Sequence, residues 1–231
     1  WRDCPPLSEL WERLECPPER PDCNRSVYLD IGANIGACLV QMLARPDVQR
    51  AIAFEPNQAN LFYLTGTVLA NEGLSRKVSL FPVGLGSSRA THRIYEEKGN
   101  AGNTALDSPT GGRTAMVGQV EVVTLDSVLM PGEQPPPYIH LAKMDAQGFE
   151  GKILQGATSL LKSGAVGAWK FEVTSTMLAG HGSSAAAVFR AFLQNGYSIS
   201  EVDGRSPLSN SALHRYACSM PNLERDFVAT R

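Results

Sequence analysis

No stretch of the sequence approaches the roughly 20 consecutive apolar residues that a helix needs to cross a bilayer, and no signal peptide is visible. A basic excess is also missing, because 21 lysines and arginines stand against 23 acidic residues and the formal net charge is −2. A nucleic-acid-binding protein usually carries a basic face. We therefore expect neither a membrane nor a nucleic-acid partner for this chain, which begins at Trp1 and fits a processed or trimmed product.

Cysteine is scarce too. Five cysteines are too few for a disulfide framework, and they lack the spacing of a zinc site. We interpret Cys38 as a small buried residue of a helix. In an oxidising compartment, Cys4, Cys16 and Cys23 can pair with each other or with Cys218. A glycosylation sequon at Asn24 indicates the secretory lumen. The localisation stays open, with the cytoplasm slightly favoured.

Prolines mark the start of the chain. Residues 1–26 contain two proline pairs and a further proline around a short helical candidate at 7–15, and we interpret them as a Pro-rich N-terminal arm. Residues 27–231 belong to a chain that is 43% hydrophobic, which is enough apolar material for one domain with its own core. The sequence therefore predicts an arm followed by a single domain.

From residue 27 onward, apolar runs alternate with helical patterns, which is typical of a parallel sheet covered by helices. The predicted strands, the fourth with its turn, are 27–32, 51–56, 78–86, 138–148, 165–174, 197–203 and 226–230. The predicted helices are 36–44, 57–71, 149–162 and 183–195. The expected fold class is α/β, with a doubly wound, mostly parallel seven-stranded sheet whose last strand is antiparallel. Two β-rich pieces, 91–97 and 117–129, surround a flexible loop at 99–112 and form a β-rich insertion after strand 3.

The first strand runs into a glycine turn, VYLDIGANIGACLV at residues 27–40. A dinucleotide-binding turn needs three glycines in the order G-x-G-x-x-G. Here Asn34 stands between Gly32 and Gly36, and Asp30 precedes the turn where it would repel a pyrophosphate. These residues disfavour a nicotinamide-dependent oxidoreductase and favour a cationic ligand that lacks phosphate.

S-adenosylmethionine is such a ligand, and its ribose hydroxyls need an acceptor. Glu55 ends the second predicted strand, where doubly wound folds place the acidic residue that binds ribose. The alternative is that the two glycines serve only backbone packing and that Asp30 caps the next helix.

Polar side chains end the fourth and fifth predicted strands, where open α/β sheets bind ligands. Strand alternation places Lys143 and Asp145 on one face. Asp145 is a candidate general base with Lys143 orienting it, and Asp145 with Glu172 is a weaker candidate for a divalent cation such as Mg²⁺. A simple ion pair of Lys143 with Asp145 is the structural alternative. His181 is a second candidate base, while His92 and His214 belong to no motif.

Five segments occur in the order typical of FkbM-type methyltransferases: DIGANIG, AFEPNQANLFYL, VTLDSVL, LAKMDAQGFEGKILQGATSLL and the strand that ends in Phe171 and Glu172. The sequence resembles this family over roughly residues 27–175. The resemblance implies a Rossmann-like class I fold and a cofactor site made of Asp30, Gly32, Ala33, Asn34, Gly36, Glu55, Pro56, Gly84 and Asp145. It also implies a reacting end with Lys143, Asp145, Gln147 and Glu150, although the family often has glutamate at the position of Gln147.

The sequence and its resemblance together predict an S-adenosylmethionine-dependent O-methyltransferase. The expected acceptor is a free hydroxyl of a sugar, a glycan or a small metabolite. The main alternative is a catalytically silent binding protein that keeps the methyltransferase fold. The sequence does not predict the oligomeric state.

Overall fold

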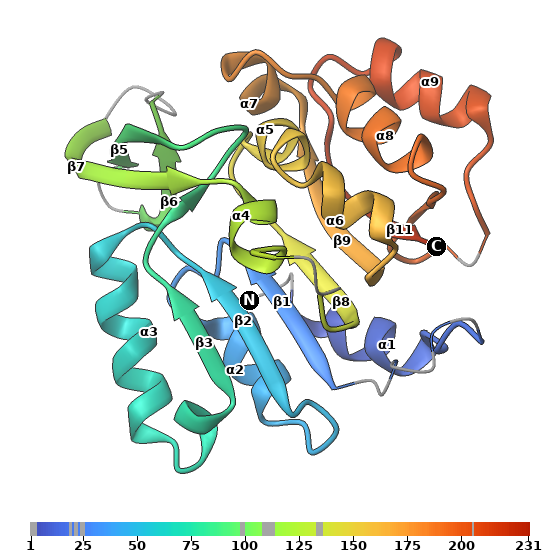
Figure 1. Cartoon of the computed structure of the whole chain (residues 1–231). Helices are drawn as coiled ribbons and strands as arrows, with labels where there is room; N and C mark the ends of the chain where they lie inside the picture. Colours follow the sequence, from blue (N-terminus) through green and yellow to red (C-terminus); the bar gives the residue numbers. More distant parts are fainter. Residues whose placement is uncertain are drawn as a thin grey trace.

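A computed structural model describes residues 4–18, 20, 23, 26–97, 100–107, 114–132, 136–204 and 206–231. The described chain forms two β-sheets, a large one between two layers of helices and a small one beside it (Figure 1). The sequon at Asn24 and the first residue, Trp1, lie outside the described residues.

The large sheet has the strand order β10-β11-β9-β8-β1-β2-β3. All neighbouring strands are parallel except β11, which is antiparallel to both β10 and β9. The strands are β1 (Val27–Ile31), β2 (Arg50–Phe54), β3 (Val78–Phe81), β8 (Ile139–Met144), β9 (Val166–Thr174), β10 (Ser198–Glu201) and β11 (Glu224–Thr230). The predicted doubly wound, mostly parallel seven-stranded sheet is confirmed, including its antiparallel last strand.

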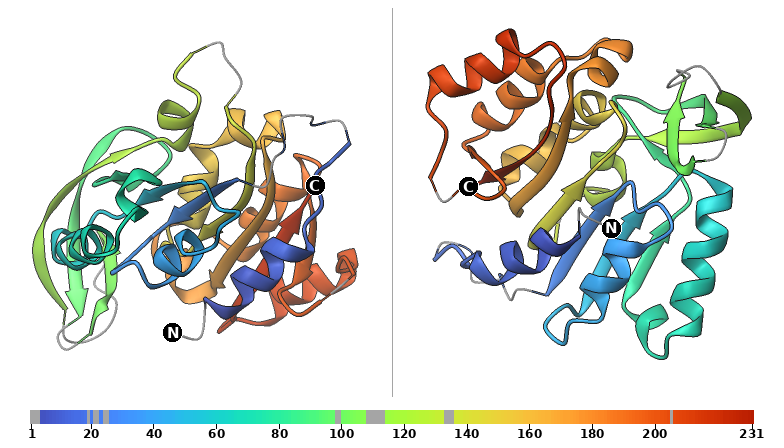
Figure 2. Two further views of the ribbon diagram at one scale, coloured as in Figure 1. Left: turned by 90° about the horizontal axis from the view of Figure 1, so that it is seen from below. Right: turned by 180° about the vertical axis from the view of Figure 1, so that it is seen from behind.

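Helices cover both faces of this sheet, and each face has its own apolar core. One face packs against α1 (Pro5–Arg13), α2 (Ala37–Leu43) and α3 (Gln58–Ala70), with the 3₁₀ helix η1 (Leu74–Arg76) beside them (Figure 2). The other packs against α4 (Leu125–Leu129), α5 (Glu150–Gln155), α6 (Thr158–Ser163), α7 (Ser175–Gly180), α8 (Ala185–Leu193) and α9 (Asn210–Ser219). Since β1, β8 and β9 are buried on both faces, they are continuous apolar runs interrupted by a few charged residues.

The small sheet confirms the β-rich insertion after strand 3. Its order is β4-β7-β5-β6, with β4 (Gly84–Leu85), β5 (Ala90–Glu97), β6 (Asn100–Leu106) and β7 (Thr114–Val123). It lies at the end of the large sheet where the parallel strands finish (Figure 1). The prediction of a loop throughout 99–112 was wrong, because β6 pairs with β5 and buries Leu106 in the core; residues 108–113 are outside the described part.

Three predicted elements are interrupted in the structure. The strand expected at 78–86 is two strands of different sheets, since Pro82 has no backbone N–H to continue the ladder. The β-rich piece at 117–129 ends in helix α4, which Thr124 caps by accepting a hydrogen bond from the backbone N–H of Ser127. The helix expected at 149–162 breaks at Gly156, where a Cβ would lie 2.1 Å from the backbone oxygen of Gly86. Helices α7 and α9 were not predicted.

Helix α1 attaches the N-terminal arm to the sheet. Trp11 is buried, and its indole N–H donates a hydrogen bond of 2.9 Å to Asp47, while its ring meets that of His140 edge-on at 4.7 Å. Two disulfides join Cys4 to Cys38 and Cys16 to Cys23. Cys38 is buried as expected, but the expected pairings did not include it, and it bonds to Cys4 of the arm.

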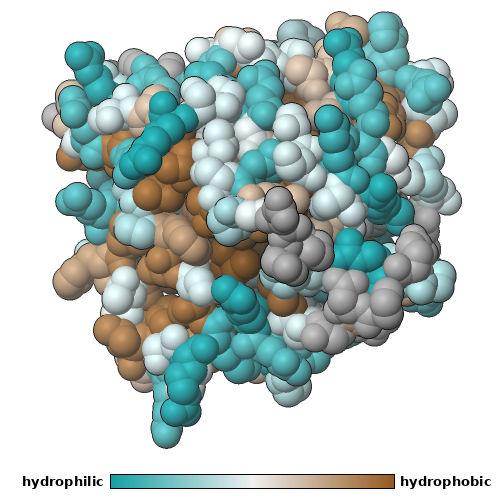
Figure 3. Space-filling view, viewed as in Figure 1, coloured by the Kyte–Doolittle hydropathy of each residue, from teal (hydrophilic) through white to brown (hydrophobic). Residues whose placement is uncertain are grey.

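Helix α3 leaves apolar side chains exposed. Phe62, Tyr63 and Leu69 are 75%, 60% and 69% exposed, and apolar side chains gather on the half of the surface that carries α3, β3 and the small sheet (Figure 3). Among the described residues, no helix combines the length and the apolar character needed to cross a membrane.

Candidate functional site

A pocket lies where β1, β2 and β8 end, beneath the small sheet. Its empty volume is about 600 Å³, which includes space open to solvent. The ends of three strands of the large sheet and residues of three strands of the small sheet, β4, β5 and β6, surround it. The lining residues are Ile31, Gly32, Phe54, Glu55, Pro56, Asn60, Val83, Gly84, Leu85, Ile94, Thr104, Leu106, Asp145, Ala146, Gln147, Phe149 and Ile153. Five predicted cofactor residues are therefore brought together: Gly32, Glu55, Pro56, Gly84 and Asp145.

The glycine turn forms one wall of this pocket. Its first two amides, from Gly32 and Ala33, donate hydrogen bonds of 3.0 Å to the backbone oxygen of Phe54. Gly32 has a φ of +76°, and a Cβ there would lie 1.9 Å from the backbone oxygen of Asp145. Asn34 adopts a φ of +54° and Gly36 a φ of +90° just before α2. The turn therefore packs directly onto β8, and only glycine fits at its first position.

Glu55 connects the turn with the start of α3. One carboxylate oxygen accepts a hydrogen bond of 2.7 Å from the backbone N–H of Asn34, and the other accepts one of 2.8 Å from that of Asn57. Burial raises the pKa of Glu55, and these two amides offset part of the rise. Because a carboxylate has about four acceptor positions, Glu55 can still accept hydrogen bonds from a ligand in the pocket.

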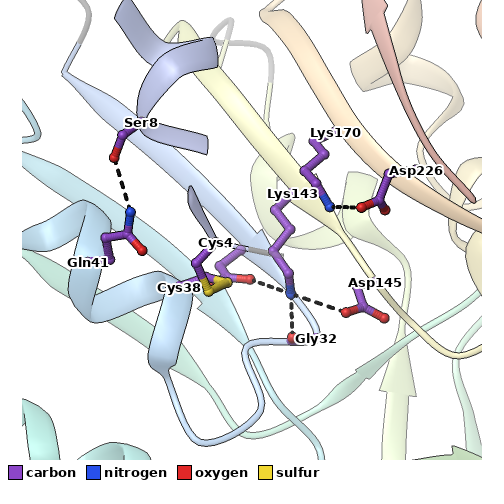
Figure 4. The surroundings of a disulfide bond; sticks show 10 residues. Cys4, Ser8, Gly32, Cys38, Gln41, Lys143, Asp145, Lys170 and Asp226 are labelled. Carbon is purple, nitrogen blue, oxygen red and sulfur yellow. Dashed lines mark hydrogen bonds and ion pairs between the residues drawn. A yellow bond between two sulfur atoms is a disulfide. The ribbon is translucent and has the colours of Figure 1, made fainter. Parts of the chain in front are cut away.

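Asp30 and Lys143 pair with each other and do not line the pocket. In Figure 4 the ammonium of Lys143 points toward the backbone of Gly32 and toward Asp145. The Lys143 ammonium lies 3.2 Å from Asp30 and donates a hydrogen bond of 2.8 Å to the backbone oxygen of Gly32. Burial lowers the pKa of Lys143, but the charges of Asp30 and Asp145 outweigh burial and hold the pKa above its ordinary value. Asp30 is fully buried, and burial raises its pKa while Lys143 offsets part of the rise. The structure thus uses the charge of Asp30 to hold Lys143, whereas we expected it to face a cationic ligand.

Asp145 occupies the pocket floor at the end of β8. Its carboxylate accepts a hydrogen bond of 2.9 Å from the Gln147 side chain and lies 3.8 Å from the Lys143 ammonium. Glu150 is buried behind it and accepts from the backbone N–H of Ala146 at 2.8 Å. Burial raises the pKa of Glu150 to about 7. The carboxylates of Asp145 and Glu150 therefore both accept hydrogen bonds from residues of the turn after β8.

Glu172 and His181 lie near this turn but do not line the pocket. Burial, followed by the negative charges of Asp145 and Glu150, raises the pKa of Glu172 to about 8. These causes favour the protonated form of Glu172. His181 follows α7 and packs edge-on against Phe149 with ring centroids 4.6 Å apart. Burial, followed by the nearby charge of Lys152, lowers the pKa of His181.

The raised pKa of Glu172 predicts a pH dependence of stability. A carboxyl whose pKa is higher in the folded than in the unfolded state binds more protons when folded. Its stabilisation is complete below the unfolded value of 4.5 and is lost as the pH rises through about 8. We expect Glu172→Gln to raise the melting temperature relative to the wild type, by an amount that grows from pH 5 to pH 8.5. Calorimetric melting checks this, with the exposed Glu72→Gln as the matched control. A pH-independent difference for Glu172→Gln would contradict it.

A metal site on Asp145 and Glu172 stays a prediction. In the part of the chain that the structure describes, one group of three potential ligands converges within 4.8 Å: Cys16, Cys23 and His140. Its two cysteines are joined in a disulfide, so their sulfurs are not thiolate ligands.

The sequence did not indicate Asn60 as a pocket residue, although its position one turn after Asn57 was a usable signal. Asn60 donates a hydrogen bond of 3.3 Å to Glu55. For Thr104 the sequence left two interpretations open, a lid over the substrate or an ordinary solvated loop. Thr104 lines the pocket and brings β6 to the start of α3 by bonding to Asn57 at 2.9 Å.

A family model described as the methyltransferase FkbM domain matches residues 30–199. This range includes every residue of the pocket and about three quarters of the chain. The chain belongs to the FkbM methyltransferase family. No curated protein sequence matches it significantly.

A solved FkbM methyltransferase structure shares the class I methyltransferase-like fold of this FkbM chain. Methyltransferase FkbM from Methylobacillus flagellatus KT matches with a TM-score of 0.51 and 16% identity, over 99% of this chain and 51% of that one. The FkbM chain thus spans about half the length of that protein. The match to the precorrin-6y C5,15-methyltransferase from Geobacter metallireducens GS-15 (TM-score 0.46, 13% identity) covers 98% of this chain and 85% of that one. The match to an rRNA methylase from Streptococcus thermophilus (TM-score 0.48, 11% identity) covers 97% of this chain and 92% of that one.

Proposed function

We propose that this FkbM methyltransferase transfers a methyl group from S-adenosylmethionine to a free hydroxyl of a sugar, a glycan or a small metabolite. The observation that carries the proposal is the position of Glu55, a buried carboxylate with spare acceptor capacity at the edge of a pocket whose wall is the glycine turn. Membership of the family supports methyl transfer. The hydroxyl acceptor rests on the resemblance of the sequence motifs.

The pocket has the chemistry that S-adenosylmethionine requires. Apolar side chains suited to the adenine ring line the same pocket as Glu55, and they include Phe54, Leu85 and Ile153. The close approach at Gly32 keeps the wall free of a side chain. The lining has carboxylates at both ends, Glu55 and Asp145, and none of its residues is a lysine or an arginine. This set of groups suits a cationic ligand with ribose hydroxyls better than a pyrophosphate.

When bound, the cofactor supplies a methyl group on a sulfonium. The chain must hold an acceptor oxygen in line with that methyl group and exclude water. Asp145 lies on the floor where the reacting end of the pocket is expected, and its hydrogen bond from Gln147 fixes the orientation of the carboxylate. The small sheet covers the pocket through Ile94 and Leu106, which reduces access of water.

The two disulfides support a site of action in an oxidising compartment, because cytosolic conditions keep most thiols reduced. We include the secretory lumen or another oxidising location in the proposal in place of the cytoplasm.

Loss of Glu55 is expected to abolish high-affinity cofactor binding. Ribose hydroxyls would lose a charged acceptor, and each such hydrogen bond contributes about 1.5–3 kcal/mol. We expect Glu55→Ala to weaken binding of S-adenosylhomocysteine by about 100-fold or more, measured by isothermal titration calorimetry. The matched control is Glu72→Ala, an exposed glutamate of the same chain.

Folding of the Glu55 variant must be checked, because its carboxylate also holds two backbone amides. Glu55→Gln keeps one acceptor oxygen and serves as the second variant, with an expected loss between those of the wild type and Glu55→Ala. Wild-type protein that fails to bind S-adenosylhomocysteine at millimolar concentration would refute the proposed function.

A further inference from the structure

A histidine–aspartate pair lies beside the pocket and has no role in the proposed function so far. The Nδ1 atom of His92, in β5, bonds to the carboxylate of Asp107, which directly follows β6. The other carboxylate oxygen of Asp107 accepts a hydrogen bond of 3.1 Å from the backbone N–H of Arg93. The N–H of Asp107 donates to the backbone oxygen of Arg93 at 2.9 Å. Three bonds thus fix the aspartate against the histidine.

The pair belongs to the side of the small sheet that covers the pocket. Side chains two residues apart on a strand point to the same face, so His92 shares a face with Ile94, which lines the pocket. Asp107 directly follows Leu106, another lining residue. The ring of His92 contacts that of Phe149, a third lining residue, with centroids 5.8 Å apart. His92 therefore lies next to the residues that line the pocket, on the side of Phe149, which follows the turn after β8.

The partner determines which nitrogen of His92 carries the proton. Partial burial raises the pKa of Asp107, but the hydrogen bonds from His92 and from the amide of Arg93 outweigh it and hold the pKa below its ordinary value. An ionised carboxylate accepts hydrogen bonds only, so Nδ1 must be the donor. In the neutral ring, Nε2 then has the free lone pair. No hydrogen bond between described residues involves Nε2.

We propose that His92, oriented by Asp107, is the catalytic base that accepts the proton of the acceptor hydroxyl. This inference rests on the proposed O-methyl transfer. The hydroxyl proton passes to Nε2, the oxygen forms the new bond to the methyl carbon, and the electron pair of the broken carbon–sulfur bond stays on sulfur. The imidazolium that results is paired with the Asp107 carboxylate and then releases its proton to solvent.

Three other titratable groups near the turn, Lys143, Glu172 and His181, are less suited to this step. Lys143 is buried and its ammonium is held by Asp30 and Gly32. Burial and the negative charges of Asp145 and Glu150 favour the protonated form of Glu172, which is a poor proton acceptor. The ring of His181 packs against Phe149, and no described carboxylate bonds to it to orient its nitrogens.

Charged and titratable groups surround the Phe149 ring that His92 contacts. The ammonium of Lys152 lies 4.5 Å from the centre of this ring, and the ring of His181 packs against it. Asp107 is the group bonded directly to His92, so its carboxylate stabilises the imidazolium that forms when Nε2 accepts the proton.

Kinetics of variants test the base directly. An acceptor is first found by screening labelled methyl transfer into sugars, glycans and small hydroxyl compounds. General-base catalysis contributes about 10²–10⁴-fold, so we expect His92→Ala to lower kcat at least about 100-fold while the affinity for S-adenosylhomocysteine changes less than threefold. The fall of the wild-type rate at acid pH should disappear in this variant. His214→Ala, an exposed histidine of α9, is the matched control.

Nitrogen-15 NMR of the imidazole rings tests the geometry without any acceptor. We expect neutral His92 to be the Nδ1–H tautomer in the wild type and to shift toward the Nε2–H tautomer in Asp107→Asn. Wild-type His92 found as the Nε2–H tautomer, or an unchanged kcat in His92→Ala, would overturn the inference and leave the proposed function standing. Wild-type protein that methylates no hydroxyl would refute the proposed function itself.

Discussion

Replacing Gly32 with alanine is expected to lower the free energy of unfolding by about 3–4 kcal/mol and to abolish cofactor binding. The left-handed φ of +76° costs a non-glycine residue roughly 1–2 kcal/mol. A Cβ would in addition lie 1.9 Å from the backbone oxygen of Asp145, and relieving such an overlap in a packed site costs about 1–3 kcal/mol. Because both atoms belong to the pocket wall, the relief must move the turn away from β8.

Alanine variants of two other glycines separate the conformational cost from the cost of the steric overlap. Gly182 has a φ of +72° with no atom within 4 Å of an added Cβ, so Gly182→Ala should show only the conformational cost. Gly66 is an exposed residue inside α3 with equally open space, and Gly66→Ala should stabilise the helix by up to about 1 kcal/mol. Urea unfolding and titration with S-adenosylhomocysteine measure both quantities. A Gly32→Ala protein as stable as Gly182→Ala would show that the turn tolerates a side chain.

Removing the disulfide between Cys4 and Cys38 is expected to lower the free energy of unfolding by about 4 kcal/mol. A cross-link stabilises a protein mainly by restricting the unfolded chain, and the effect grows with the number of residues it encloses. This bond spans 34 residues and ties the arm to α2, whereas the bond between Cys16 and Cys23 spans 7 residues and should contribute about 2 kcal/mol. For a chain of this length, about 4 kcal/mol corresponds to a fall of roughly 8–16 °C in melting temperature.

The experiment compares two double variants, Cys4→Ala with Cys38→Ala and Cys16→Ala with Cys23→Ala. Cys218→Ala is the control, because Cys218 is exposed and forms no disulfide. Unreduced wild type should melt highest, and wild type in a strong reductant should melt below the Cys4 and Cys38 double variant, because the reductant also breaks the bond between Cys16 and Cys23. Equal losses in the two double variants would contradict the dependence on loop length. A melting temperature that reductant leaves unchanged would contradict the contribution of the bonds themselves.

Local sequence patterns predict the large sheet and the turn beside the pocket. The alternation of apolar runs with helical patterns implies helices on both faces of a parallel sheet, and the structure has this arrangement. Gly32 and Glu55 each follow a strand. Because the carboxyl ends of parallel strands lie at one edge, these residues were expected to meet, and both line the pocket.

Charged residues show where a local pattern stops being informative. Asp30 and Lys143 are 113 residues apart, and the alternation along each strand does not reveal that they pair with each other. Asp30 was therefore assigned to the cofactor and Lys143 to the reacting end, although the structure places both outside the pocket lining. His92 and Asp107 were overlooked for the related reason that neither belongs to a motif, and only the pairing of β5 with β6 brings them together.

The sequence by itself determined the fold class, the insertion after strand 3, the family and the turn that builds the pocket. These features depend on residues close together in the chain, whose periodicity, glycines and strand-end acids act locally. Only the tertiary structure decided which cysteine joins Cys38, which carboxylate neutralises Lys143 and which histidine lies against Phe149. Such pairs depend on how strands and helices far apart in sequence pack together, and packing and the pairing of buried charges select their partners only once the core has formed.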